Sequence, residues 1–376
     1  MTTPDGSRIR GLDGLRALSI GLVLVSHAIG TRGFPWPNFG DGLGDLGDLG
    51  VRVFFVISGF LITTLLLRED QATGISIKGF YIRRALRILP AFSCFLLAVA
   101  VLDRAGAIRL WPGDLLHSLT FSMNYHTERS WYVGHIWSLS EEEQFYLLWP
   151  ALLCLAGIAG SMWSAAAAIA IAPVVRVLMF WAFPEHERLI HQAFPTTMDS
   201  IAVGCLYAGA RHYFRSAEEG PLVVRSGVIA LGLVVGAFIC NSLSVHPWFK
   251  YAMGASLMNL AIAGVIDFVV NTNGRCDRVL NWPPIVYIGT LSYSLYLWQQ
   301  LFMNRQSDFL VCSFPLNVLA SLGVSAFSYQ VLEQPLLRLR SRFRHQASQG
   351  AQKAMPSGIT PAISGHVIPV EIPGPR

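Results

Sequence analysis

Long apolar stretches recur along almost the whole chain, and they limit its fold more than any other feature. A hydrocarbon core about 30 Å thick requires roughly 20 apolar residues of helix to cross it. Segments that approach this template lie at residues 12–30, 49–67, 88–103, 145–160, 162–183, 198–212, 226–243, 250–270, 284–303 and 309–332. The pattern predicts an all-α, polytopic membrane helix bundle with about ten transmembrane helices.

The composition supports a membrane protein over a soluble one. Of the 376 residues, 53% are hydrophobic and 14% are charged, and the mean hydropathy is +0.46. A soluble globular protein usually carries about 25% charged residues. The six cysteines form no C-x-x-C pair and lie mostly in apolar segments, which supports neither a disulfide framework nor a zinc site. The opening MTTPDGSRIRGLDG shows no small-residue cleavage site, so we expect no cleaved signal peptide.

The basic residues predict the topology. Ten spans place both termini on one side of the membrane. With cytoplasmic termini, 18 of the 28 Lys and Arg residues fall in inner segments and only 7 in outer ones. This excess follows the positive-inside rule, so the net charge of +5 requires no nucleic-acid partner. The outer cations are Arg32, Arg104, Arg109, Arg129, Arg188, Lys250 and Arg305.

The chain divides into two parts on composition. Residues 1–345 contain all the apolar segments and are predicted to form one membrane domain. Residues 346–376 are rich in Gln, Ser, Gly and Pro, which is typical of a disordered segment. We therefore expect a disordered cytoplasmic tail.

The first apolar segment, LDGLRALSIGLVLVSHA (12–28), holds two polar groups, Arg16 and His27. Eleven residues of helix span about 16 Å and three turns, so the two side chains share one helix face. Ionisable groups are expensive in a membrane and usually face the bundle interior, where they serve function. We expect both to line one water-accessible cavity. In the alternative, Arg16 reaches the lipid headgroups and His27 caps the helix or bonds a backbone carbonyl.

Four stretches in order identify a family resemblance. LDGLRALSIGLVLVSH is similar to the first-span signature of the acyltransferase-3 family of integral membrane O-acyltransferases, in which ten residues separate an Arg or Lys from a His. GVRVFFVISGFLI (50–62), FYIRRALRILP (80–90) and HIWSLSEEEQFYLLWP (135–150) resemble its later blocks. Weaker matches are MDSIAVGCLYA (198–208), LSYSLYLW (291–298) and SYQVLEQPLLRLR (328–340), so the resemblance covers about residues 11–344.

The chain departs from the family at two positions. Gln299 follows the LSYSLYLW block where members often have His, and Thr197 stands two residues before Asp199 where many have Arg. The resemblance therefore assigns no role to these two residues, and the acceptor can differ from that of other members.

The resemblance implies a membrane-bound O-acyltransferase of the cell membrane, with the bacterial inner membrane as the favoured location. The family moves acyl groups from cytoplasmic acyl-CoA, with acetyl-CoA the default, to hydroxyls of sugars, polysaccharides, lipid-linked glycans or secondary metabolites, and no metal is expected. A thioester is already activated, so the reaction needs a base for the acceptor hydroxyl and stabilisation of the oxyanion. His27 is expected to be that base, with Glu142 or Asp13 orienting or charging it.

Further candidates bind the two substrates. Arg side chains contact phosphate bidentately, so we expect the CoA phosphates to bind Arg16, Arg83, Arg84 and Arg87. The alternative is that cytoplasmic arginines beside a span only set topology. Candidate acceptor contacts are His135, Trp137, Arg52 and Arg176. For Trp137 the alternative is an interfacial anchor, and for the two arginines it is structural pairing with Asp199 or Asp267.

Two other functional classes compete with the enzyme. A transporter or flippase would also use intramembrane Arg, His and Asp. It predicts Gly- or Pro-broken helices at matching positions in two halves, and the sequence shows no such pairs. A non-enzymatic membrane scaffold gives no reason for buried ionisable groups on one face. The acceptor, the acyl chain, the side from which the acceptor enters and the oligomeric state stay open at the sequence level.

Overall fold

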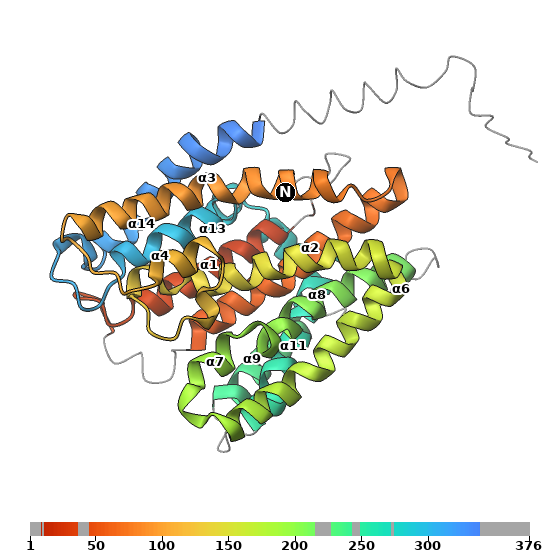
Figure 1. The fold of residues 1–376 in the computed structure, drawn as a ribbon. Helices are drawn as coiled ribbons and strands as arrows, with labels where there is room; N and C mark the ends of the chain where they lie inside the picture. Colours follow the sequence, from red (N-terminus) through yellow and green to blue (C-terminus); the bar gives the residue numbers. More distant parts are fainter. Residues whose placement is uncertain are drawn as a thin grey trace, which may run out of the picture.

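The computed structural model describes residue 9 and residues 11–36, 45–214, 227–242, 249–271 and 274–338. Within these ranges the regular secondary structure consists of helices, with no β-strand, which confirms the all-α prediction (Figure 1). The predicted tail at residues 346–376 lies outside the described residues.

Helices make up most of the described part of the chain. The α-helices are α1 Leu12–Ala28, α2 Asp45–Thr73, α3 Ile77–Arg104, α4 Asp114–Leu119, α5 Trp131–Gly134, α6 Ile136–Ala182, α7 Glu187–Gln192, α8 Phe194–Phe214, α9 Gly227–Ser242, α11 Ala255–Asn271, α12 Arg275–Leu280, α13 Pro283–Phe302 and α14 Leu316–Ser328. Short 3₁₀ turns are η2 Met123–Tyr125, η3 Pro184–His186 and η5 Leu310–Cys312, and π turns are η4 Lys250–Gly254 and η6 Tyr329–Glu333.

The helix lengths and composition fit a membrane protein. In the described part of the chain, four helical segments are long and apolar enough to cross a membrane. They are Leu46–Thr73, Ile77–Arg104, Trp131–Ala182 and Lys250–Asn271. This confirms the membrane helix bundle as a class, whereas the number of ten spans and the cytoplasmic termini stay predictions.

Several helix limits differ from the predicted spans. The predicted spans 145–160 and 162–183 correspond to the two parts of α6, which are two helices joined at a kink at Gly157, where the backbone is non-helical with φ 66°, a conformation that glycine adopts readily. In Figure 1 the helix runs to the right and then returns towards the lower left. The last helix begins later than predicted: the span 309–332 opens with the short turn η5, and α14 starts only at Leu316, directly after Pro315.

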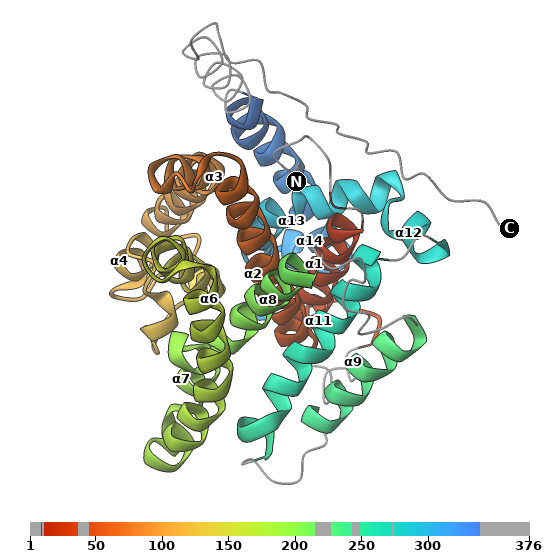
Figure 2. The same cartoon turned by 90° about the vertical axis from the view of Figure 1, so that its right-hand side faces the viewer.

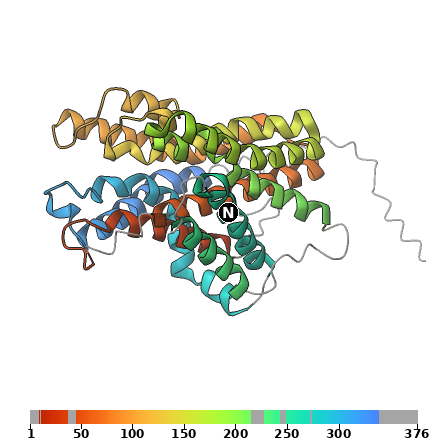
Figure 3. The same cartoon turned by 90° about the horizontal axis from the view of Figure 1, so that it is seen from below.

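Helix α1 lies inside the bundle and packs against both α2 and α13 (Figure 2). Helix α8 packs between α2 and α6. A Cβ added at Gly59 of α2 would overlap the carbonyl oxygen of Ile201 in α8, so a small residue lets these two backbones approach closely. Viewed from below, α3 and α6 lie on one side of the bundle and α1 with α13 on the other (Figure 3). This arrangement surrounds His27 and Arg16 with other helices.

Candidate active site

The imidazole of His27 is held by a residue of α13. Nδ1 of His27 lies 2.8 Å from Oε1 of Gln299. An amide oxygen only accepts hydrogen bonds, so Nδ1 carries the proton and Nε2 keeps its lone pair. The indole of Trp131 meets the imidazole edge-on, with ring centroids 5.4 Å apart. The ring is therefore fixed in orientation and has a basic nitrogen to offer.

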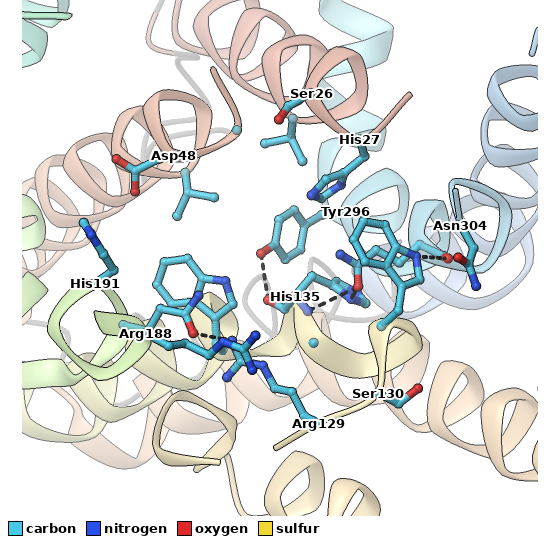
Figure 4. A pocket seen from close by; sticks show the side chains of 18 of the residues that line it. Ser26, His27, Asp48, Arg129, Ser130, His135, Arg188, His191, Tyr296 and Asn304 are labelled. Carbon is cyan, nitrogen blue, oxygen red and sulfur yellow. Dashed lines mark hydrogen bonds between the residues drawn. The ribbon is translucent and has the colours of Figure 1, made fainter. Parts of the chain in front are cut away.

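A cavity of about 750 Å³ opens beside His27 (Figure 4). Its volume is within the range of sites that hold small ligands. Three large aromatic side chains stand in its wall, namely Trp131, Trp137 and Tyr296. This is the part of the described chain in which a ligand can reach the imidazole.

His135, expected as an acceptor contact, lies in the wall of the same cavity. Its Nδ1 is 2.8 Å from Oε1 of Gln300 and its Nε2 is 3.1 Å from the carbonyl oxygen of Leu297. The hydroxyl of Tyr296 donates to the carbonyl of His135 at 2.7 Å. Both ring nitrogens of His135 thus already face protein oxygens, so the ring is a rigid part of the wall.

Arg16 lies in a separate environment. Its Nε and Nη2 donate to Oγ of Ser292 at 3.1 and 2.9 Å, and its guanidinium lies 5.8 Å from the ring centroid of Phe54. It does not line the cavity of His27. Ile20 and Val23 stand between the two in α1, at 0% and 1% exposure, within one apolar cluster. The expectation that Arg16 and His27 share one cavity therefore does not hold for the cavity that His27 lines.

The other inner arginines lie among carboxylates. The guanidinium of Arg84 is 3.5 Å from the ring centroid of Tyr146. Its nitrogens are 3.9 Å from Glu142 and 3.6 Å from Glu143. Arg83 forms an ion pair with Glu69 at 2.5 Å. For Arg87, the structure shows an electrostatic interaction with Glu333.

The structure places the two expected partners of His27 elsewhere. Glu142 lies beside Arg84 and interacts electrostatically with Arg16. Asp13 stands fourteen residues before His27, about 21 Å along the same helix axis. Neither carboxylate can orient the imidazole directly in this arrangement, and the hydrogen bond that does so comes from Gln299.

Arg52 and Arg176 have structural partners. Nε of Arg52 donates to Oδ2 of Asp48 at 2.6 Å, and Asp48, not Arg52, lines the cavity. Arg176 and Asp199, 3% and 0% exposed, form an ion pair at 3.1 Å. Arg176 also donates to Ser256 at 2.7 Å. Of the two partners expected, Asp199 is the one that Arg176 contacts, and Arg176 is not part of the cavity wall.

Sequence reasoning did not identify Gln299 as the partner of His27. The two residues are 272 positions apart, and only the packing of α1 on α13 brings them together. The one available signal was the departure itself, a Gln directly after LSYSLYLW where the resembled family often has His. Within the described ranges, no group of three His, Cys, Asp or Glu side chains could hold a metal ion.

Comparison with known proteins places the chain in a family. The sequence model of a family described as an acyltransferase domain matches residues 9–327. A Staphylococcus aureus (strain COL) protein, provisionally named an O-acetyltransferase, is 28% identical over 324 residues, which are 77% of this chain and 50% of that protein. The peptidoglycan O-acetyltransferase OatA of Listeria monocytogenes is 24% identical over 374 residues, 87% of this chain and 56% of its own length.

The chain spans about half the length of the curated relatives that it matches. No solved structure gives a significant match. The family match extends from before α1 into α14 and includes His27, Gln299 and the cavity wall. The chain therefore belongs to this acyltransferase family.

Proposed function

We propose that this protein is a membrane-bound O-acyltransferase that moves an acyl group, by default acetyl, from acyl-CoA to a hydroxyl of a glycan, a lipid-linked sugar or a secondary metabolite. The observation that carries the proposal is His27, fixed by Gln299 at the edge of a ligand-sized cavity. The names of the relatives, O-acetyltransferase and peptidoglycan O-acetyltransferase, favour acetyl and a glycan. Residues 1–345 would form the membrane domain of this multi-pass enzyme of the cell membrane.

The reaction uses the free nitrogen of the imidazole. The acceptor hydroxyl passes its proton to Nε2 of His27 while its oxygen attacks the carbonyl carbon of the thioester. The C–S bond breaks, and the leaving thiolate of CoA takes up the proton from the imidazolium. Gln299 keeps Nδ1 protonated throughout, so that Nε2 is the nitrogen that exchanges the proton.

The donor binds at the other end of α1 in this proposal. Arg16, Arg83, Arg84 and Arg87 are the contacts for the CoA phosphates, and Glu142 positions Arg84 rather than His27. The acyl end must travel about 16 Å along α1 to reach His27. Ile20 and Val23 are packed across that route, so this apolar layer has to open when the donor binds.

The test is acyl transfer by the purified full chain in lipid nanodiscs, with acetyl-CoA and a peptidoglycan fragment as probes. A general base contributes about 10²- to 10⁴-fold to the rate, so His27→Ala should lose at least about 10²-fold of the transfer. His212→Ala, which changes a histidine outside the cavity wall, should keep it. If the protein is instead a transporter or flippase, no variant should release the thiol of CoA. Normal transfer by His27→Ala would refute the role of His27 as the base.

A further inference from the structure

Cationic side chains gather around the cavity of His27. Arg129, Arg188, Lys250 and Arg305 all line it. They come from four separate places along the chain, before α5, in α7, at the start of η4 and after α13. These are four of the seven cations that the sequence assigns to outer segments, where the positive-inside rule predicts few. Membrane topology alone does not explain why these four cations lie around one cavity.

None of these four cations forms an ion pair with a carboxylate in the described part of the chain. Arg305 donates through Nη2 to the carbonyl oxygen of Ser26 at 2.9 Å. Arg188 donates to the carbonyl of Thr127. Arg129 donates to the carbonyls of Met123 and His126 and to Gln192. Lys250 makes no hydrogen bond within the same ranges. By contrast, Arg52, Arg83, Arg84 and Arg176 each lie within 3.6 Å of a carboxylate.

Two carboxylates lie in the cavity wall, and one of them is already paired with an arginine. Asp48 accepts from Arg52, a residue behind the wall, at 2.6 Å. Glu187 accepts from the hydroxyl of Tyr251 at 3.2 Å and lies 3.6 Å from His191, so it sets one negative charge against the four cations of the wall. Burial, together with the nearby Arg188, lowers the pKa of Arg129 to about 10. The cavity therefore carries a positive potential that its own wall does not cancel.

We infer that the cavity takes an acidic glycan as its acceptor, a sugar chain whose rings carry carboxylate or phosphate groups. This inference rests on the proposed function. Sugar rings would lie against Trp131, Trp137 and Tyr296, and the reacting hydroxyl would face His27. Arg305 is close enough to His27 for an electrostatic interaction, so one acidic group would lie beside the reacting ring. Arg188 and Arg129 lie across the cavity from His27 and would receive the charge of a neighbouring sugar (Figure 4).

The experiment compares matched probes on the full chain in nanodiscs of uncharged phosphatidylcholine. The probes are a trigalacturonate, its carboxyl-reduced neutral counterpart and a phosphorylated trisaccharide. Binding is measured by calorimetry, and acetyl transfer from acetyl-CoA by mass spectrometry. The variants are Arg305→Gln and the double variant Arg188→Gln with Lys250→Gln. Arg109→Gln is the matched control, an exposed outer arginine that does not line the cavity.

We expect an acidic probe to bind about tenfold or more tightly than the neutral one, and to weaken between about 50 and about 500 mM salt. Each cavity variant should lose about tenfold or more in affinity for the acidic probe, since it loses a charge-assisted hydrogen bond. Binding of the neutral probe should not change, and Arg109→Gln should behave as the parent protein. The preferred acidic probe distinguishes a carboxylate from a phosphate ligand.

Two outcomes separate this inference from the proposed function. Equal affinity for the acidic and neutral probes, with acetyl transferred to both, would leave the enzyme in place and overturn the acidic acceptor. Selective, salt-sensitive binding that the cavity variants lose, with no acetyl transferred to any probe, would support the anionic ligand and remove the proposed reaction. Because the double variant changes two residues far from Arg305 in the sequence, a failure of Arg305→Gln to fold still leaves one arm of the test.

Discussion

Replacing Gln299 with leucine removes the acceptor that holds Nδ1 of His27. Gln299 has 0% exposed surface, so water cannot take the place of its amide oxygen. An unsatisfied donor in such a site costs about 1–3 kcal/mol. If this cost falls on the transition state, where the ring must receive the hydroxyl proton, kcat drops by about 5- to 150-fold.

The assay is steady-state acetyl transfer by parent protein and variant in nanodiscs. Gln299 touches the base and does not line the cavity, so kcat should fall while KM for both substrates stays unchanged. Gln299→Glu supplies an oxygen at the same reach and should keep kcat within about tenfold of the parent value, provided that the hydrogen bond is what matters. A Gln299→Leu protein that melts at the parental temperature and turns over at the parental rate would refute the positioning role.

Three further predictions concern the donor site, the fold and pH. Arg84→Ala should raise KM for acetyl-CoA by about tenfold or more with little change in kcat, because a charge-assisted contact to phosphate is lost. Initial-rate measurements test this, and an unchanged KM would exclude phosphate binding by Arg84. Asp199→Ala leaves the buried charge of Arg176 without its partner and should lower the free energy of unfolding by about 3–5 kcal/mol. An unfolding midpoint equal to that of the parent protein would mean that Arg176 finds another counter-charge. Burial and the stacked His117 lower the pKa of His126. The folded state therefore disfavours protonation of His126 and should lose stability as pH falls below about 6.5. In thermal melts, His126→Gln should lose less stability on acidification than the parent protein, and an identical loss would contradict this.

The fold class could be read from the sequence, since each apolar segment must be helical wherever it meets the bilayer. The limits of the segments could not. Hydropathy separates residues 145–160 from 162–183, and the structure does divide α6 into two helices, but the break lies at Gly157, where a single backbone conformation sets it. The start of α14 at Leu316, inside the predicted span 309–332, likewise could not be read from the apolar run.

The candidate site was predictable only in part. His27 was singled out as an ionisable group that shares one face of the first predicted span with Arg16, and it does reach a cavity. Two features depend on which helices become neighbours and could not be predicted. They are the residue that orients His27 and the apolar layer between His27 and Arg16. Glu142 illustrates the difficulty, because its position in the WSL-x-x-E block resembles that of a catalytic residue, whereas its contact is Arg84.

The sequence by itself determined what each segment must do locally. It set the helical, membrane-type character of the chain, put Arg16 and His27 on one face of α1 and limited the outer cations to a few. The tertiary structure alone decided which polar groups meet, because helices distant in sequence pack through apolar surfaces that do not specify their polar partners. The pairing of His27 with Gln299, and the gathering of four cations round one cavity, arise from that packing.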